Sequence, residues 1–517
     1  MAEIFYKPTG AWAADFIPFY KDGRFRLFYL QDWRNIPEHG EGTPWYQIST
    51  DDLVHFEEHG EMLARGTKDE QDLYVFTGSV IEELGQSQGR LASKQSHGDS
   101  KQSHRDSKQY HIFYTGHNPY FRAQGKPEQG VMHAVSDDLL TWRKIPEDTF
   151  YAPQALGVQA VAYEMHDWRD PFVFWNPDAG EYWMLLAARS KSGPSRRRGC
   201  TALCASRDLK HWEVRDPLYA PGLYYTHECP DLFKMGEWWY LVFSEFSERL
   251  VTRYRMARSL SGPWLTPPDD QFDGRAFYAA KTTSDGSRRY LFGWNPTREG
   301  NKDYGSWHWG GNLVVHEINQ RPDGTLSVCV PEAVDRAFGI PTPATLQPGL
   351  GTCTATSNGI RLDGTGTFAC AVGSVMPEQC RIDAEIVVSD AARFAGIMLR
   401  VSDDLEKAYY IRIEPSRNRL VFDMWPRPGD VPFMPELERP LVALTPSARG
   451  TALSPDQAVL PGHHAYKLQV YVEGTVCVVY VNGEVAMSTR LYNLPQGKWG
   501  VFVEDGVAEF HHVQHTM

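Results

Sequence analysis

The sequence lacks most of the features that mark helical, membrane-bound or nucleic-acid-binding proteins. Segments with the helical spacing of apolar residues are almost absent from its 517 residues, and no run is long and apolar enough to span a membrane. The start, "MAEIFYKPTGAWAADF", has no basic segment followed by an apolar run, so we expect no signal peptide and a cytoplasmic location. A net charge of −13 offers no basic surface for phosphates, which argues against nucleic acid as a partner.

Cysteine is also scarce and dispersed. The eight cysteines include one close pair, Cys200 and Cys204, but no second pair lies at the spacing that a structural zinc site requires. We therefore expect reduced thiols and no metal site. Aromatic residues are abundant instead, at 13% of the chain with 16 Trp and 25 Tyr, a load found both in sugar-binding proteins and in Trp-rich β-folds.

Short apolar strands recur in pairs joined by Gly, Asp or Asn turns, a pattern typical of β-hairpins. Several pairs are followed by a related polar turn, seen in "STDDLVHF", "VSDDLLTW", "ASRDLKHW" and more weakly in "ARSLSGPW". Repeated small antiparallel sheets without helices predict a β-propeller, and five pairs predict five blades over residues 1–338. The pairs are residues 15–30, 78–84 with 110–118, 170–189, 229–245 and 278–294.

The second pair is interrupted by a Ser/Gln/His-rich stretch at residues 85–109. A seven-residue unit is repeated nearly twice in "SKQSHGDSKQSHRDSKQYH", which begins inside this stretch. Its histidines are compatible with metal capture, but the duplication favours a disordered insertion. A turn between the first and second strands of a blade lies on the face opposite the first-strand starts, so we expect this insertion to be far from any site there.

The pattern of the sequence changes after the fifth pair of predicted strands. "GIPTPATLQPGLG" is rich in Pro and Gly and predicts a linker over residues 339–350. Residues 351–517 then alternate polar and apolar positions with regular turns, which predicts a C-terminal antiparallel β-sandwich. The fold class is therefore all-β. We expect the sandwich to brace the propeller, with carbohydrate binding or homo-oligomer formation as alternatives.

Three acidic residues stand where the first strands of different blades begin: Asp15, Asp170 and Glu228. First strands line the central channel of a propeller, so these carboxylates should converge at one end of it. Like charges in a confined space raise the pKa of the least solvated group. One protonated acid beside one ionised carboxylate is what glycoside cleavage needs. Each acid alone is better explained as a turn cap, but three at matching blade positions favour catalysis.

Six short motifs follow one another along the chain: Trp12-x-x-Asp15, Phe76-Thr77-Gly78-Ser79, Arg169-Asp170-Pro171, Glu228-Cys229, Tyr278-Ala279-Ala280-Lys281 and Gly293-Trp294. In kind and order they resemble those of glycoside hydrolase family 32, which holds invertases, levanases, inulinases and fructosyltransferases. The resemblance covers essentially the whole chain. A propeller followed by a sandwich is also the plan of that family.

The resemblance implies a role for each acid. Asp15 would be the nucleophile that forms a covalent fructosyl-enzyme, Glu228 the general acid and then base, and Asp170 the stabiliser of the transition state. Retention of configuration would place the Asp15 and Glu228 carboxyl groups about 5–5.5 Å apart. Arg169 would keep the adjacent Asp170 ionised, which leaves the acid role to Glu228. The chemistry implies no cofactor. The implied substrate-binding residues are Trp12, Trp45, Phe76, Ser79, Arg169, Tyr278, Lys281 and Trp294.

The sequence departs from the family around the nucleophile. Ala14 stands where the family has an Asn, and Leu30 where it has a Gln, with Gln31 and Asp32 adjacent. Those amides normally bind the innermost sugar, so we expect sugar recognition to be remodelled. Loops between second and third strands return to the active face and are candidates for new contacts. They are residues 31–45, 116–130, 189–199, 244–253 and 295–309; Arg196, Arg197 and Arg198 in the third suit a solvated loop better than an anionic sugar.

The resulting hypothesis is a retaining hydrolase of β-fructofuranosidic bonds in short fructo-oligosaccharides or disaccharides. Three alternatives stay open. A fructosyltransferase, including one that forms a difructose anhydride, would use a sugar in place of water. A hydrolase of another furanoside, such as arabinofuranose, would keep the three acids, and a non-catalytic sugar-binding module would explain the altered nucleophile loop.

Overall fold

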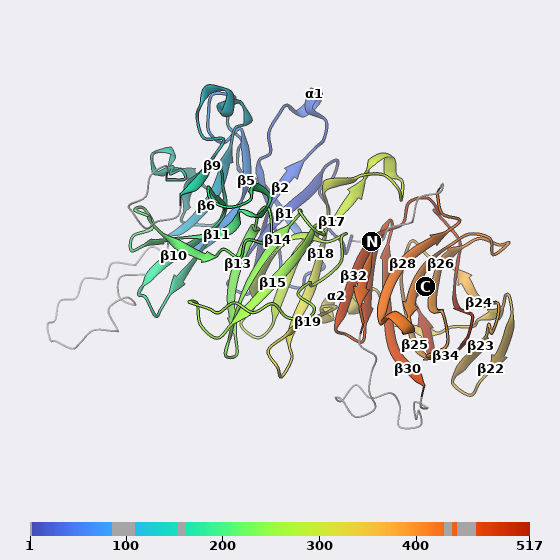
Figure 1. Cartoon of the computed structure of the whole chain (residues 1–517). Helices are drawn as coiled ribbons and strands as arrows, with labels where there is room; N and C mark the ends of the chain where they lie inside the picture. The colour runs from blue at the N-terminus through green and yellow to red at the C-terminus, as the bar shows by residue number, and fades with distance from the viewer. Residues whose placement is uncertain (1–2, 85–108, 154–161, 429–436, 442–461, 517) are drawn as a thin grey trace, which may run out of the picture.

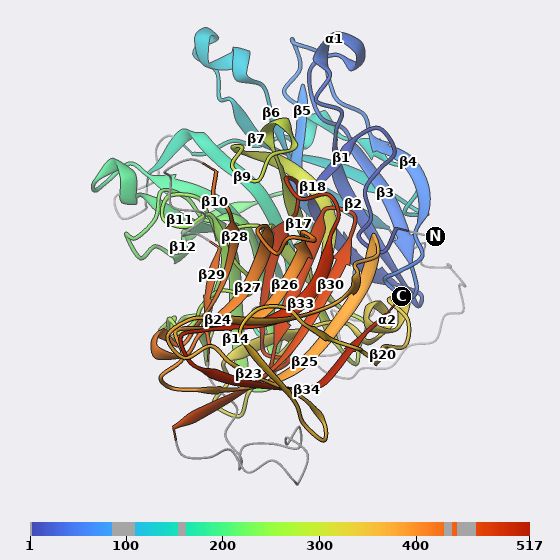
Figure 2. The same cartoon turned by 90° about the vertical axis from the view of Figure 1, so that its right-hand side faces the viewer.

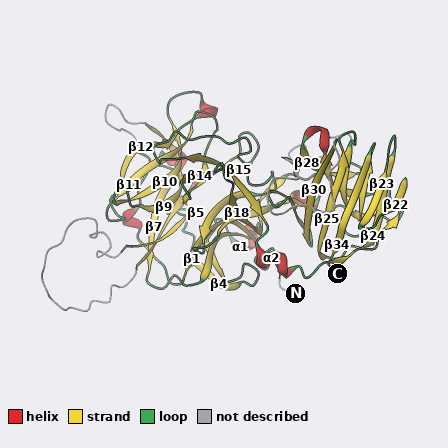
Figure 3. Cartoon of the chain, turned by 90° about the horizontal axis from the view of Figure 1, so that it is seen from below, coloured by secondary structure: helices red, strands yellow, loops and turns green. Residues whose placement is uncertain are grey.

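The computed structural model describes residues 3–84, 109–153, 162–428, 437–441 and 462–516, so the predicted insertion at 85–109 lies almost wholly outside the described part. Strands dominate the chain in Figure 3, and its longest described α-helix is α2, Glu332–Ala337. No described helix is long and apolar enough to cross a membrane. The N-terminal two thirds and the C-terminal third form two bodies of sheet that lie side by side (Figure 1).

Five blades make up the first body, as the hairpin count predicted, and they form four antiparallel sheets because two of the blades share one. The fourth blade has three strands. An isolated bridge between Met256 and Leu265 flanks its weaker turn motif, "ARSLSGPW". The blades are β1 (Trp12–Lys21), β2 (Arg24–Asp32), β3 (Trp45–Thr50), β4 (Glu57–Leu63); β5 (Tyr74–Glu82), β6 (Tyr110–His117), β7 (Gln129–Ser136), β8 (Arg143–Lys144); β9 (Tyr163–Asn176), β10 (Glu181–Ser190), β11 (Gly199–Ser206), β12 (Glu213–Tyr219); β13 (Glu228–Met235), β14 (Trp238–Glu245), β15 (Val251–Ala257); and β16 (Tyr278–Ser284), β17 (Arg289–Arg298), β18 (Trp307–Gln320) with β19 (Leu326–Cys329).

The first and fifth blades are joined into one sheet. Strand β1 pairs with β18 through Ala13 and Gly311, so the ring of blades is closed by strands from the two ends of the domain. This closure covers edges that would otherwise be free to pair with other chains.

The recurring polar motif is a tight turn that ends the third strand of a blade. In the first blade, the Thr50 hydroxyl accepts the Leu53 amide at 2.9 Å, and Asp52 accepts the amide of His55 at 2.8 Å. Leu53 has φ +65° and is buried. Leu139 and Leu209 repeat this left-handed conformation in the second and third blades. The motif therefore satisfies the turn amides with side chains while a leucine anchors it in the core.

The second body is a sandwich of two antiparallel sheets. One has the order β22-β23-β34-β25-β30-β31-β32 and the other β21-β24-β33-β26-β27-β28-β29. The predicted linker contributes two short strands to it, β20, which pairs with β34, and β21, which pairs with β24. The bounds are β20 (Thr342–Pro343), β21 (Gln347–Pro348), β22 (Thr352–Ala355), β23 (Gly359–Asp363), β24 (Phe368–Val375), β25 (Gln379–Ser389), β26 (Phe394–Val401), β27 (Ala408–Glu414), β28 (Arg419–Trp425), β29 (Glu438–Pro440), β30 (His463–Glu473), β31 (Val476–Val481), β32 (Val485–Arg490), β33 (Lys498–Glu504) and β34 (Val507–His515).

The sandwich packs on the propeller through the outer face of the sheet that contains β30, β31 and β32. Side chains of these strands share one hydrophobic cluster with the propeller. Buried Asp273 of the propeller accepts hydrogen bonds from the amide and hydroxyl of Ser488, at 2.7 and 2.6 Å, and lies 3.0 Å from His316 Nε2. Arg490 donates to two backbone carbonyls of β17. The interface is therefore both apolar and hydrogen-bonded, as a fixed brace requires.

Candidate active site

The first strand of every blade carries an irregularity at the same place. The pairing of first with second strand shifts by one residue in all five blades, as in a β-bulge. Bulges re-aim side chains and are common beside active sites. The last paired residues before the shift are Ala14, Phe76, Arg169, Glu228 and Tyr278, and the residues that follow them are Asp15, Thr77, Asp170, Cys229 and Ala279.

Four of the following residues, all except Thr77, have a left-handed backbone, with φ of +48° at Asp15 and +59° at Asp170. This conformation costs a non-glycine residue about 1–3 kcal/mol and persists only where the surroundings impose it. The two sets form two rings around one end of the channel. Asp15 and Asp170 belong to one ring and Glu228 to the other, so the third acid stands one residue earlier in its strand.

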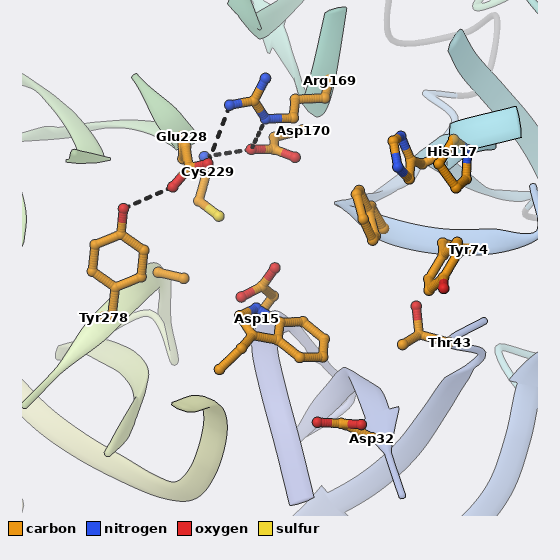
Figure 4. A pocket seen from close by; sticks show the side chains of 14 residues that line it. Asp15, Asp32, Thr43, Tyr74, His117, Arg169, Asp170, Glu228, Cys229 and Tyr278 are labelled. Carbon is orange, nitrogen blue, oxygen red and sulfur yellow. Dashed lines mark hydrogen bonds and ion pairs between the residues drawn. The ribbon is translucent and has the colours of Figure 1, made fainter. Parts of the chain in front are cut away.

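The two rings open into a cavity of about 520 Å³. Figure 4 shows Asp15, Asp170 and Glu228 facing one another across it, although 58 residues or more separate them in the sequence. The expected convergence of the three carboxylates is therefore confirmed. The lining residues are Asp15, Asp32, Thr43, Tyr74, Phe76, His117, Pro119, Arg169, Asp170, Glu228, Cys229, Tyr278, Ala279 and Trp309.

Arg169 contacts a second acid besides the one expected. It is ion-paired with Asp170, whose Oδ2 lies 3.9 Å from Nε, but its Nη2 also donates to Glu228 Oε1 at 3.1 Å and its Nη1 to Asp167 at 2.8 Å. The contact with Glu228 follows from the ring geometry, because Arg169 and Glu228 hold equivalent positions on neighbouring blades. Asp170 also accepts the Cys229 amide at 2.9 Å. Since Arg169 is paired with both carboxylates, its charge does not by itself distinguish the acid from the stabiliser.

Two aromatic residues of the fifth blade each donate a hydrogen bond to one of the acids. Tyr278 donates its hydroxyl to Glu228 Oε2 at 2.7 Å, and Trp294 donates Nε1 to Asp15 Oδ1 at 3.0 Å. Lys281 lies deeper and is buried, where its Nζ donates to the Thr77 hydroxyl at 2.9 Å and so joins the fifth blade to the second. Two cations and three carboxylates thus share the end of the channel.

Proton affinity is high at this end of the channel. Burial, with repulsion from Asp170, raises the pKa of Asp15 to about 7, against the hydrogen bond from Trp294 and the charge of Lys281. Burial also raises the pKa of Glu228, although Arg169 opposes the shift. Because three carboxylates face two cations, one shared proton leaves the cluster neutral. The site therefore holds a carboxylic acid and a carboxylate together near neutral pH.

The two positions that depart from the family pattern do not line the cavity. Ala14 and Leu30 are fully buried among apolar neighbours. Asp32 lines the cavity instead, and its carboxylate is held by the amide of Arg34 at 2.9 Å and by Arg34 Nε at 3.3 Å. Arg34 also donates to the Trp309 carbonyl at 2.7 Å, which fixes two rim loops together.

His117 is a second polar group of the cavity that sequence reasoning missed. Its ring stacks on Phe76 with centroids 4.7 Å apart. Burial, with the positive charges of Arg169 and Arg122, lowers the pKa of His117 to about 4. The neutral ring therefore offers one donor and one acceptor to a ligand. The available signal was the predicted loop 116–130, which includes His117 and was expected on the active face; in the structure His117 is the last residue of β6.

Five residues predicted to bind substrate lie outside the cavity lining, namely Trp12, Trp45, Ser79, Lys281 and Trp294. Trp12 lies in a hollow between propeller and sandwich, with the Arg34 guanidinium 4.9 Å from its ring centroid. Trp45 was expected in the pocket wall, but it begins β3, is fully buried and donates to the Phe76 carbonyl at 3.0 Å. Ser79 accepts the Val173 amide at 2.9 Å and so joins two blades. Trp45 and Ser79, like buried Lys281, position the cavity wall.

The second-to-third-strand loops divide between two places. Three supply cavity residues, namely 31–45, 116–130 and 295–309. Arg196 and Arg197 of 189–199 and Ser247 and Glu248 of 244–253 line a separate hollow of about 720 Å³. Arg198 is ion-paired with Glu164 at 2.9 Å. Among the described residues, no group of three or more His, Cys, Asp or Glu side chains is arranged to hold a metal ion.

These features together define a class of carbohydrate-active proteins. They are a five-bladed propeller followed by a sandwich, three carboxylates that face one another at one end of the channel, and an arginine bound to one of them, Glu228. The chain belongs to glycosyl hydrolases family 32. The family's N-terminal domain model matches residues 6–320 and its C-terminal model residues 354–516. The fold class and the family inferred from the six motifs are thus confirmed.

Known proteins similar to this chain act on fructosides, according to their names. A sucrose-6-phosphate hydrolase from Vibrio alginolyticus is 26% identical over 59% of this chain, and a levanbiose-producing levanase from Bacillus subtilis is 23% identical over 60% of it. The matches span 58% and 56% of those two proteins' own lengths. Among solved structures, an exo-inulinase from Aspergillus awamori matches with a TM-score of 0.66 at 17% identity, over 99% of this chain and 98% of its own. Fructan 1-exohydrolase IIa from Cichorium intybus matches with a TM-score of 0.67 at 14% identity, over 100% and 98%.

Proposed function

We propose that this protein is a retaining β-fructofuranosidase that hydrolyses short fructo-oligosaccharides or disaccharides. The observation that carries the proposal is the meeting of Asp15, Asp170 and Glu228 in one cavity, with Arg169 and Tyr278 on the acid. Membership of the family and the fructoside-cleaving relatives support the substrate class.

In the first step, the Asp15 carboxylate attacks the anomeric carbon of the fructosyl unit. The bond from that carbon to the leaving oxygen breaks, and Glu228 gives its proton to this oxygen, so the leaving group departs as a neutral alcohol. Asp170, held by the Cys229 amide, provides negative charge beside the oxocarbenium-like transition state. The product of this step is an ester between Asp15 and the sugar.

In the second step, the roles of Glu228 reverse. Formation of the ester removes the negative charge of Asp15, which is among the charges that raise proton affinity in the cluster. Glu228, now ionised and held by Arg169 and Tyr278, takes a proton from water as the water oxygen attacks the anomeric carbon. Two displacements at the same carbon return the original configuration.

Rescue by azide tests these roles separately. With a fructosyl donor whose leaving group needs no proton, Glu228→Ala should form the ester and stall, and azide should restore turnover by giving a β-fructosyl azide. Asp15→Ala should give neither a burst nor a β-configured azide. A product of inverted configuration from the unmodified protein, followed by NMR before mutarotation, would refute retention.

Analysis of the products formed from sucrose, kestose, inulin and levan fragments shows whether water or a sugar accepts the fructosyl unit. Free fructose as the main product supports hydrolysis, whereas fructosylated sugars or a cyclic difructose would assign transfer. If the protein binds these sugars and releases no product from any furanoside, it is a binding protein and the proposed activity is wrong.

A further inference from the structure

The sandwich has a hollow that its bracing role leaves unexplained. The propeller covers the outer face of the sheet with β30, β31 and β32, so the outer face of the other sheet lies on the opposite side of the sandwich. Figure 2 shows β28, β27, β26 and β33 of this second sheet side by side, in the order of their pairing. A hollow of about 710 Å³ lies on them.

Apolar side chains line the hollow, although a sheet face turned to solvent is usually polar. Phe368, Phe394, Leu405 and Tyr410 line it and pack on a buried cluster that is separate from the core between the two sheets. The cluster consists of Cys370, Val372, Met398, Val401, Ala408 and Phe502, of which Phe502 also lines the hollow. A concave surface with an apolar lining is typical of ligand sites.

Aromatic rings line the hollow and meet one another at several angles. Phe368 stacks on Phe502 with centroids 5.8 Å apart, and Tyr410 meets Phe502 edge-on at 5.0 Å. Trp425 at the end of β28 is 57% exposed. Rings that stand at different angles around a concavity fit a ligand with several apolar faces and hydroxyl edges, such as a sugar chain.

The charged groups of the hollow favour a neutral ligand. All three of its arginines are ion-paired: Arg393 with Glu504 at 2.5 Å, and Arg412 and Arg427 with Asp423 at 2.7 and 2.5 Å. An anionic or cationic partner would have to break these pairs, whereas hydroxyl groups can add to them as donors and acceptors. Arg412 Nε is buried without a hydrogen-bond partner among the described residues.

The shape of the surface argues against a second copy of the chain as its occupant. A two-fold dimer through this face would set the same hollow against itself, and two concave surfaces leave the space between them unfilled. A volume of about 710 Å³ lies in the range of small-molecule sites and accommodates several sugar units.

We propose that the outer face of β24, β33, β26, β27 and β28 is a second carbohydrate-binding site, which holds an uncharged polysaccharide chain remote from the catalytic cavity. Trp425 and Tyr410 would stack on sugar rings, and the Asp423 pair with Arg412 and Arg427 would bind hydroxyl groups. Attachment of this kind keeps a polymer near the enzyme without changing how the cavity cleaves a bond.

Affinity electrophoresis of the full chain tests the site, with levan, inulin or dextran in the gel. Asp15→Ala is the parent, so that no polymer is consumed, and fructose saturates the cavity. We expect levan or inulin to retard the parent, and Trp425→Ala and Arg427→Ala to weaken retention about fivefold. Val375→Ala is the control, because Val375 is 62% exposed at the opposite end of β24 from Phe368, the one residue of that strand that lines the hollow.

Each other result overturns the proposal. The first such result is that no polymer retards the protein, and the second is that Trp425→Ala is retarded as much as the parent. The third is a dimer in sedimentation that Trp425→Ala dissociates, because the face would then be an interface between copies. Sucrose hydrolysis by otherwise unmodified Trp425→Ala should equal that of the unmodified protein. A protein that holds levan but never cleaves a fructoside would refute the proposed activity and leave this site standing.

Discussion

Replacing Tyr278 with phenylalanine removes one hydrogen-bond donor from Glu228 and leaves the ring in place against Trp294, whose centroid lies 5.7 Å away. Burial, together with the neighbouring carboxylate of Glu228, raises the pKa of Tyr278 well above its usual value, so its hydroxyl keeps its proton and stays a donor. A hydrogen bond to a charged group is worth about 1.5–3 kcal/mol. Since one pKa unit corresponds to about 1.36 kcal/mol, its loss should raise the pKa of Glu228 by about 1–2 units.

The sign of the effect is fixed by which form the hydrogen bond favours. Tyr278 stabilises the carboxylate of Glu228, so Tyr278→Phe extends the protonated form to higher pH. The alkaline limb of kcat/KM reports the essential acid of the free enzyme and should move upward by about 1–2 units. Initial rates of fructose release from sucrose between about pH 4 and pH 9 measure it.

Tyr74→Phe is the matched control for this shift. Tyr74 lines the same cavity but donates to Glu41, at 3.1 Å, and to no acid of the site, so its loss should leave the limb unchanged. An alkaline limb that stays in place or moves downward in Tyr278→Phe would refute the assignment of Glu228 as the acid under the control of Tyr278.

Three further predictions follow from the geometry. Asp15→Asn should abolish turnover yet stabilise the fold at pH 8 by on the order of 2 kcal/mol. Because the pKa of Asp15 is raised in the folded protein, the stability of the unmodified protein falls as pH rises from about 4 to about 7, so urea unfolding should show the gain of the variant at pH 8 and none at pH 4. Asp32→Asn should raise KM about tenfold with kcat nearly unchanged, and an unchanged KM would remove Asp32 from sugar binding. Asp273→Ala should cost about 3–5 kcal/mol in thermal or urea unfolding, because it leaves His316 and the Ser488 amide buried without their acceptor; a loss below about 1 kcal/mol would contradict this role.

The blade plan was predictable because it depends on local signals. Strand alternation and the polar turn motif act within about ten residues, and in the first blade the turn is closed by groups as near as Thr50 and Leu53. The three acids followed from that plan, since each was expected near the channel end of a first strand. Only Glu228 in fact starts its strand, because β1 begins three residues before Asp15 and β9 seven residues before Asp170. Sequence order and topology were sufficient to bring them together.

Side-chain partners were not predictable in the same way. Trp45 was assigned to the pocket because its surroundings resemble a loop, but it begins a strand and its burial depends on the second blade packing against it. The second partner of Arg169 was not predictable for a related reason. Adjacency in sequence indicated Asp170, which is ion-paired with it, whereas the contact with Glu228 comes from adjacency in the ring. The ring position depends on a bulge that has no signature in a single sequence.

The two rings separate the altered position of the first blade from its acid. Ala14 occupies the ring position that Arg169, Glu228 and Tyr278 hold on other blades, so the first blade alone contributes a small apolar side chain there. Asp15 follows in the other ring, and its contact with Trp294 does not involve Ala14. We therefore expect an amide at position 14 to affect sugar binding and not the placement of Asp15, with Asp32 as a polar group of the cavity that can contact the sugar instead. If that reasoning holds, Ala14→Asn should change the preference among fructosides through KM while the pH dependence of kcat/KM stays that of the parent, and a displaced pH profile would show that the two rings are not independent.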